Sequence, residues 1–283
     1  WILAVSATLC STAVLAAAWY FLARSRRPAK PAQAPPAVAA TFTQLTDQPG
    51  PELFPSLSPD GRSFVYASKG DIYLQRVGGK NPINLTKDCP AEDTQPAFSP
   101  DGERIAFRCE RQGGGIFVMG ATGESAKRLT DFGYNPAWSP DGKQLVCASE
   151  RIDRPSVRGT VSKLWVVNLS TGANRVIHEG DAVQPHWSPN GQRIAYWELS
   201  GTGYGIWTLP ADGGAPVLVI KEAALNWNPV WSPDGKFVYF SSDRAGSLNL
   251  WRVPVEEQSG KVLGPAEPLT TPTTDASHIS FSG

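Results

Sequence analysis

Cysteine, methionine and histidine are scarce in this chain of 283 residues, which has four, one and three of them. Four cysteines are too few for a disulfide scaffold in a chain of this length. The histidines, at positions 178, 186 and 278, lack the spacing of metal ligands, so the sequence predicts no metal site. A net charge is also missing, because 26 Lys and Arg balance 26 Asp and Glu. No overall field favours nucleic acid, and we expect no such partner.

Catalytic motifs are missing as well. The chain has no G-x-S-x-G nucleophile motif and no glycine-rich phosphate loop. Asp131-Phe132-Gly133 matches the magnesium motif of kinases, but the other kinase motifs do not accompany it. We therefore expect this chain to be no enzyme, to have no catalytic residues and to need no cofactor.

What the chain does contain is one phrase, Pro-x-x-Ser-Pro-Asp/Asn-Gly, written five times. The copies stand at 55–61, 96–102, 136–142, 185–191 and 229–235, and a sixth, SHISFSG, begins at 277. A Leu, Phe or Trp precedes each Ser-Pro, at intervals of 40 to 50 residues. A repeat of this length with an aromatic marker and a tight turn predicts a β-propeller built one blade at a time.

Each copy has the chemistry of a turn between two antiparallel strands. Pro presets φ, Asp caps the turn with its own side chain, and Gly supplies the left-handed conformation. A third strand follows with an aliphatic-aromatic pair such as Ile116-Phe117, and a fourth often ends in Leu-Thr, as at 129–130. The predicted fold is all-β, with four-stranded blades over residues 41–283. That segment holds about five and a half blades of a ring of six, and 41–46 is expected to complete the last one.

Residues 1–22 carry no charge, and arginines follow at 24, 26 and 27. A run of this length predicts one transmembrane helix over 1–23, with a signal peptide as the alternative. Residues 24–40 are rich in Pro and Ala and are expected to form a semi-extended linker. The arginines after the helix favour a cytoplasmic propeller under the positive-inside rule, but the opposite flank is not in this sequence.

Ligands of propellers commonly bind at the rim where loops lead into the first strand of each blade. The residues that we expect there are Glu92, Asp93, Gln95, Tyr134, Asn135, Asp181, Gln184, Trp227, Asn228, Asp275 and His278. They either cap strand ends and hydrate the channel, or they bind a protein, a peptide or a small envelope ligand. The long link at 150–163, with Arg151, Arg154 and Arg158, is a solvated loop or a partner-binding arm.

The cysteines of the repeats divide into two groups. Cys147 occupies a column held in the other copies by Tyr66, Phe107, Tyr196 and Phe240, which predicts a core position. Cys89 lies in the loop before the second repeat, and Cys109 ends its second strand. Blade geometry places both at the same rim, as a disulfide or as two separate thiols.

These phrases resemble the TolB-type propeller repeat, with its core P-x-W-S-P-D-G-x-x-I-A-F, over residues 41–283. More narrowly, QLTDQPGPELFPSLSPDG and LTKDCPAEDTQPAFSPDGERIAF look like the C-terminal regions of bacterial transmembrane serine/threonine kinases. That resemblance implies a non-catalytic sensor or protein-interaction propeller outside the cytoplasm, held by a single membrane span and signalling to a domain upstream. The alternatives are a TolB-like envelope protein in transport or cell-wall assembly, and the propeller of a prolyl-oligopeptidase-like hydrolase.

Overall fold

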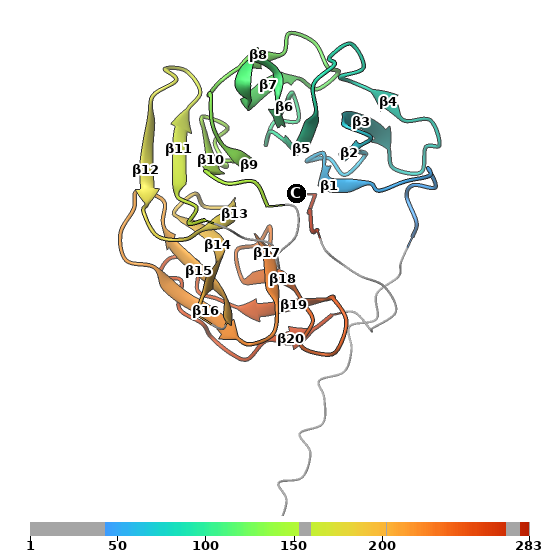
Figure 1. Ribbon diagram of the computed structural model, residues 1–283. Helices are drawn as coiled ribbons and strands as arrows, with labels where there is room; N and C mark the ends of the chain where they lie inside the picture. Colours follow the sequence, from blue (N-terminus) through green and yellow to red (C-terminus); the bar gives the residue numbers. More distant parts are fainter. Residues whose placement is uncertain (1–42, 153–159, 202, 270–277, 283) are drawn as a thin grey trace, which may run out of the picture. The chain divides into compact units, whose positions relative to one another are not determined.

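Five antiparallel sheets of four strands surround a central axis in the computed structural model (Figure 1), which describes residues 43–152, 160–201, 203–269 and 278–282. In every sheet the strands are neighbours in sequence order. The first blade contains β1 (Leu53–Leu57), β2 (Ser63–Ser68), β3 (Asp71–Arg76) and β4 (Ile83–Asn84). The second contains β5 (Asp93–Phe98), β6 (Arg104–Cys109), β7 (Gly115–Gly120) and β8 (Lys127–Arg128), with a short 3-10 turn at Arg111–Gly113.

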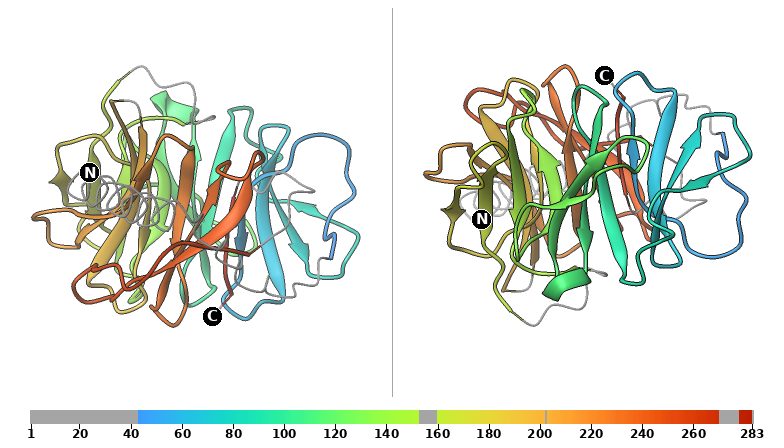
Figure 2. Two further views of the ribbon diagram at one scale, coloured as in Figure 1. Left: turned by 90° about the horizontal axis from the view of Figure 1, so that it is seen from below. Right: turned by 90° about the horizontal axis from the view of Figure 1, so that it is seen from above.

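The remaining three blades repeat this order. They are formed by β9 (Tyr134–Trp138), β10 (Gln144–Ala148), β11 (Leu164–Asn168) and β12 (Asn174–His178); by β13 (Val183–Trp187), β14 (Arg193–Ser200), β15 (Gly203–Pro210) and β16 (Val217–Glu222); and by β17 (Asn226–Trp231), β18 (Phe237–Ser242), β19 (Asn249–Pro254) and β20 (Glu267–Pro268). The predicted propeller of four-stranded blades is thereby confirmed for five blades. Figure 2 shows the ring from two sides, with the loops and turns gathered at two opposite rims.

The repeated phrase forms the turn between the first two strands of each blade. In the fifth blade the Ser232 hydroxyl donates to Asp234 Oδ1 at 2.7 Å, and the same oxygen accepts the Lys236 N–H at 3.1 Å. Gly235 has a φ of 69°, so glycine is the residue that fits there without strain. These turns lie at one rim, which we call the turn rim, and the loops that lead into each first strand lie at the other, the loop rim.

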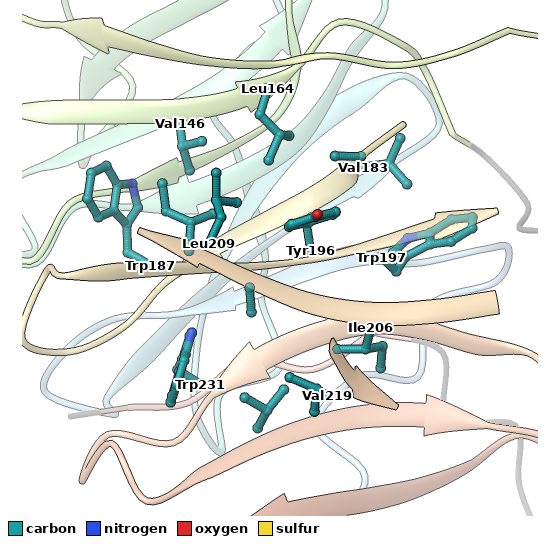
Figure 3. Close-up of a cluster of buried hydrophobic side chains, with 14 of the residues drawn as sticks. Val146, Leu164, Val183, Trp187, Tyr196, Trp197, Ile206, Leu209, Val219 and Trp231 are labelled. Atoms are coloured by element: carbon teal, nitrogen blue, oxygen red, sulfur yellow. The ribbon is translucent and has the colours of Figure 1, made fainter. Parts of the chain in front are cut away.

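The hydrophobic core is divided among the spaces between neighbouring blades. Figure 3 shows the largest group, in which Trp187, Tyr196 and Trp197 of the fourth blade pack with residues of the third and fifth. Trp197 and Trp231 are almost completely buried. The column predicted for Cys147 is confirmed as a core position, since Cys147 and its four counterparts are all buried.

The segment 278–282 lies between the fifth blade and the first. The Ser280 hydroxyl accepts the Leu57 N–H at 2.9 Å, just as the Ser56 hydroxyl accepts the Phe98 N–H at 3.0 Å between the first two blades. Phe281 packs edge-on against Tyr239, with 4.8 Å between ring centroids. Residues 278–282 thus stand where the first strand of a sixth blade belongs, and Figure 1 shows the C-terminus beside β1.

Three predictions about the N-terminal region have different outcomes. The helix over 1–23 and the linker over 24–40 lie outside the described residues. Within the described ranges, no helix is long and apolar enough to span a membrane. Residues 43–48 form no strand, so the prediction that 41–46 completes the last blade is not confirmed. Instead, the Leu45 carbonyl accepts a hydrogen bond from Gln75 of β3, in the first blade, at 2.9 Å.

Candidate functional site

A cavity of about 450 Å³ occupies the centre of the ring. It is lined by the innermost strand of every blade, β1, β5, β9, β13 and β17, and by the segment 278–282. We call it the central channel. Pockets for small ligands and peptide segments usually have volumes of roughly 300–1,000 Å³, so this channel is large enough to hold one.

Six residues in equivalent positions line the channel. They are Phe54, Gln95, Asn135, Gln184, Asn228 and His278, and we call them the channel ring. Gln95, Asn135, Gln184, Asn228 and His278 were predicted for the loop rim, and the structure brings them together. Phe54 was missed, although its place before Pro55 in the repeated phrase marks it as a member of the same column.

A backbone irregularity holds this ring in place. The first five members have φ values between 47° and 55°, in the left-handed region. Each lies within a shift of register between the first and second strands of its blade, for example between Thr94 and Ala97 in β5. A β-bulge of this kind redirects a side chain and bends the strand. Its repetition in five blades turns one side chain from each inner strand toward the common axis.

The amides of the channel ring have unused hydrogen-bonding capacity. Gln95 Oε1 accepts the Asn135 N–H at 2.7 Å. Gln95 Nε2 and Asn135 Oδ1 are buried and have no partner among the described residues. Gln184 differs, because its Oε1 accepts the Trp197 indole N–H at 2.6 Å. Buried polar groups normally have a partner, so an unpartnered amide nitrogen and an unpartnered amide oxygen in the channel wall are exceptions that a bound molecule would explain after a small side-chain movement.

The histidine of the ring is neutral at physiological pH. Burial lowers the pKa of His278 to about 4. Its ring lies edge-on to Phe54 and to Trp227, at centroid distances of 4.6 and 5.5 Å. Trp227 was predicted as a rim residue with a structural or a ligand-binding role, and the structure favours the structural one. It is 2% exposed and packs against Trp197, so it supports the channel wall from behind.

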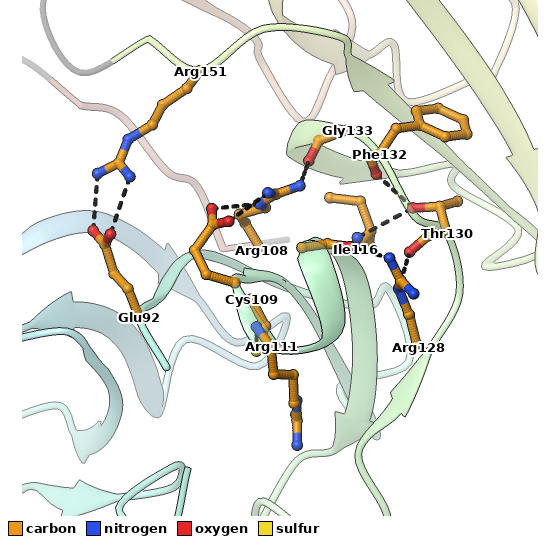
Figure 4. A network of polar contacts seen from close by, with 12 residues as sticks. Glu92, Arg108, Cys109, Arg111, Ile116, Arg128, Thr130, Phe132, Gly133 and Arg151 are labelled. Atoms are coloured by element: carbon orange, nitrogen blue, oxygen red, sulfur yellow. Dashed lines mark hydrogen bonds and ion pairs between the residues drawn. The ribbon is translucent and has the colours of Figure 1, made fainter. Parts of the chain in front are cut away.

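Two further predicted residues are engaged in contacts at the loop rim, and Figure 4 shows one of them, Glu92. Glu92 is exposed and forms a bidentate ion pair with Arg151, at 3.0 and 2.8 Å. Tyr134 lies under the Arg108 guanidinium, which is 4.2 Å from the ring centroid and pairs with Glu110 at 2.7 Å. The link from 150 to 163 thus reaches the second blade through Arg151, while Arg154 and Arg158 lie outside the described residues.

Asp181 has a structural role at the same rim. One carboxylate oxygen accepts the Ser162 N–H at 3.1 Å and the other accepts the Leu199 N–H at 2.9 Å. It therefore connects the loop before β13 to the link before β11 and to β14, which matches the strand-capping alternative. Asp275, the remaining acidic residue predicted for the rim, lies outside the described residues.

Asp93 was predicted as a rim residue that caps a strand end or binds a partner, and in the structure its side chain is completely buried. It is the first residue of β5 and pairs with Cys109 of β6. Both side chains are completely buried. Burial raises the pKa of the Asp93 carboxyl and raises the pKa of the Cys109 thiol to about 12. Cys89 and Cys109 are close, as predicted for the same rim, but both thiols are free.

A ring of four-stranded sheets around a central channel defines a β-propeller domain. Residues 62–266 match the family described as the tricorn protease N-terminal β-propeller domain, and the chain belongs to that family. An uncharacterized protein of Agrobacterium fabrum is 26% identical over 171 residues, which cover 58% of this chain and 55% of that protein. The Tol-Pal system protein TolB of Anaeromyxobacter dehalogenans is 31% identical over 98 residues, 34% of this chain and 21% of that protein.

A solved structure gives the same result for the fold. Putative TolB from Agrobacterium tumefaciens superimposes with a TM-score of 0.65 at 23% identity, covering 76% of this chain and 80% of the other. The predicted TolB-type propeller is confirmed. The predicted likeness to transmembrane kinases gains no support from these matches. The chain spans about half the length, or less, of the curated relatives it matches.

Proposed function

We propose that this chain is the binding propeller of a TolB-like envelope protein, and that an extended segment of a protein partner binds in the central channel. The observation that carries the proposal is the channel ring, where Gln95 Nε2 and Asn135 Oδ1 are buried without a partner in the described part of the chain. The function therefore follows the TolB-like alternative of the sequence analysis rather than the kinase sensor.

The chemistry of the ring suits a peptide better than a charged small molecule. Carboxamides both donate and accept hydrogen bonds, as peptide groups do, and Gln95 and Asn135 offer one of each. Among the ring members none carries a charge at neutral pH, since the pKa of His278 is about 4. Phe54 and His278 add an aromatic surface for an apolar side chain. We infer that selectivity comes from hydrogen bonding and shape instead of ion pairing.

Location and attachment belong to the same proposal. The likeness to TolB supports a propeller outside the cytoplasm, and residues 1–23 would hold it at the membrane. An upstream kinase domain stays a hypothesis based on the sequence resemblance alone.

A second candidate is the propeller of a peptidase, favoured by the match to the propeller of tricorn protease. In that arrangement the channel would admit peptides to a hydrolase domain elsewhere in the full protein. A G-x-S-x-G motif in the complete gene, together with peptide hydrolysis by the full protein, would favour this candidate. We expect the present chain by itself to hydrolyse no peptide.

Site-specific photocrosslinking in the native cells tests the binding proposal. A photoreactive residue at Asn228 in the channel should crosslink to one partner protein several times more strongly than one at Lys236, which is exposed at the turn rim. The variant carrying both Gln95→Gly and Asn135→Gly should lose most of the crosslink. Glycine removes both amides and still fits the left-handed backbone, at φ values of 54° and 51°.

The control for this experiment is Asn190→Gly, a turn-rim change that should leave the Asn228 crosslink unchanged. Equal crosslinking from the two rims would show that the channel is not the binding site. A double variant that folds normally and keeps the full crosslink would show that the carboxamides do not bind the partner.

A further inference from the structure

A second group of polar side chains lies away from the channel, beside the loop that joins the first two blades. Asp93 and Cys109 face each other across β5 and β6, and both are fully buried. Cys89 is half-buried, in a turn closed by a hydrogen bond of 2.8 Å from its N–H to the Thr86 carbonyl. The two sulfur atoms and a carboxylate oxygen all lie within 4.8 Å of one another.

The carboxylate of Asp93 makes no ion pair and no hydrogen bond of normal geometry with the described residues. Both of its oxygens are buried, and neither has a hydrogen-bond partner among the described residues. Its polar neighbours are the two thiols and the Thr86 hydroxyl, and all three favour the charged form of the carboxylate. The Thr86 oxygen accepts the Ile72 N–H at 3.0 Å, which leaves its O–H to donate toward Asp93. Burying a carboxylate without a strong hydrogen-bond donor or a cation destabilises the folded state, by a penalty on the order of several kcal/mol.

From this juxtaposition we propose that Cys89, Asp93 and Cys109 form a binding site for a thiophilic divalent cation, with Zn²⁺ the best match. Two thiolates and a carboxylate are established zinc ligands, and the softer sulfur atoms select zinc over magnesium or calcium. The ligand atoms around tetrahedral zinc lie roughly 3.3–3.8 Å apart, as its bond lengths of about 2.0–2.3 Å require. Each pair of ligand atoms would have to move together by at most about 1.3 Å to reach that geometry.

The surroundings provide access and balance the charge. Three protein ligands leave a fourth position for solvent, and the half-buried Cys89 is the side from which an ion would enter. Two thiolates and one carboxylate would give the zinc complex a net charge of −1. Arg111, whose charge acts on both Asp93 and Cys109, offsets this charge.

A disulfide between Cys89 and Cys109 is the competing use of the same residues. Both thiols are free in the structure. A disulfide would also leave the Asp93 oxygens without a partner, whereas a cation binds all three groups at once. The sequence predicted no metal site because only histidine spacing was considered, and none of these ligands is a histidine. Bound zinc would link the loop after β4 to the second blade, close to Glu92 at the loop rim.

The test uses the full chain, purified in mild detergent because of its apolar N-terminal run, then reduced and freed of metal. Zn²⁺ is titrated in competition with a chromophoric chelator, and Co²⁺ is added separately to detect thiolate-to-metal absorption. We expect one equivalent of zinc, a thiolate–cobalt absorption band, and a higher Tm with zinc because the ion binds the folded state. The Asp93→Asn variant should bind zinc at least about tenfold more weakly, since removal of a supporting group alone has that effect.

Cys147→Ala is the matched control, because Cys147 is a buried thiol of the third blade outside the cluster. It should bind zinc as the unaltered chain does. If Asp93→Asn does not fold, Cys89→Ser provides the same comparison at a half-buried position, and it should lose the cobalt band.

The proposal is overturned if the reduced chain binds no zinc, or if Asp93→Asn binds as tightly as the unaltered chain. Equal loss of binding in Cys147→Ala would show nonspecific capture by thiols. A Cys89–Cys109 disulfide formed in air, together with no zinc binding after reduction, would assign the pair to redox chemistry instead. None of these results depends on whether the central channel binds a peptide, so the two proposals can fail separately.

Discussion

At the scale of single residues, the acidic residue of the repeated turn is held in its charged form. In the third blade the Ser139 hydroxyl donates to Asp141 Oδ1 at 2.6 Å, and the Lys143 N–H reaches the same oxygen at 3.1 Å. These bonds lower the pKa of Asp141, and equivalent bonds lower the pKa of Asp60, Asp101 and Asp234. The fourth blade has Asn190 in this position, where its Oδ1 makes the same two contacts at 2.9 Å without a charge.

These shifts predict acid-sensitive turns. A carboxyl whose pKa is lower in the folded state contributes stability above its unfolded pKa of about 3.9, and this contribution is lost as pH falls through the folded value. At pH values lower than about 4, the free energy of unfolding should therefore decrease as the pH is lowered. In urea titrations at pH 7, Asp234→Ala should destabilise the chain by about 1 kcal/mol, the usual net value of a lost hydrogen bond or two.

Asp234→Asn is the control for this prediction, since Asn190 shows that asparagine fits the turn. It should have nearly normal stability at pH 7 and a smaller loss between pH 5 and pH 3. An Asp234→Asn variant with an unchanged acid transition would contradict the assignment.

At the scale of the strand, the feature that builds the site is the bulge in each innermost strand. The left-handed residue precedes a proline in all five blades, as in Asn228-Pro229. Proline has no N–H to give to the sheet, so the irregular position falls where a ladder hydrogen bond is already missing. The same local chemistry thus interrupts the sheet and directs a side chain into the channel.

This account predicts opposite effects for two substitutions at Asn228, whose φ is 51°. Valine should destabilise the chain by about 1–2 kcal/mol, because a β-branched side chain is strained in the left-handed conformation. Glycine should be nearly neutral, since it lacks the side chain that causes the strain. Chemical denaturation of both variants measures the difference. Equal stability of the two would mean that the left-handed conformation does not constrain this position.

At the scale of the whole molecule, each blade is held mainly by its two neighbours, because the buried residues gather between successive sheets. The contact between the last described segment and the first blade has the same form as the contacts between other blades. A ring of this kind leaves only short, protected sheet edges, which limits the edge-to-edge pairing that leads to aggregation.

Two aromatic residues in equivalent positions should therefore differ in their effect on stability. Trp231→Ala should cost about 3–5 kcal/mol, because Trp231 is 2% exposed between two complete blades. Phe281→Ala should cost about 1–2 kcal/mol, since Phe281 is only half-buried against Tyr239. Thermal and urea unfolding of both variants tests this order. A Phe281→Ala variant as stable as the unaltered chain would show that the segment 278–282 does not help to close the ring.

The sequence by itself determined the architecture of this protein. The spacing of the Ser-Pro-Asp-Gly turns, the aromatic marker and the paired apolar residues predicted the blades, because turn chemistry and alternation act over a few residues. The same reasoning found Gln95, Asn135, Gln184 and Asn228 of the channel ring, since they occupy equal positions in the repeat.

Only the tertiary structure decided which rim residues are accessible and which are buried. Beyond each bulge the alternation of the strand shifts by one residue, so the face of a side chain cannot be counted along the sequence. Asp93 and Trp227 were placed in rim loops by their sequence positions, whereas the structure has them in β5 and β17, where they pair with neighbouring strands and are buried. The grouping of Cys89, Asp93 and Cys109 depends on the pairing of β5 with β6 and on the path of the preceding loop, which are set by contacts between segments distant in sequence.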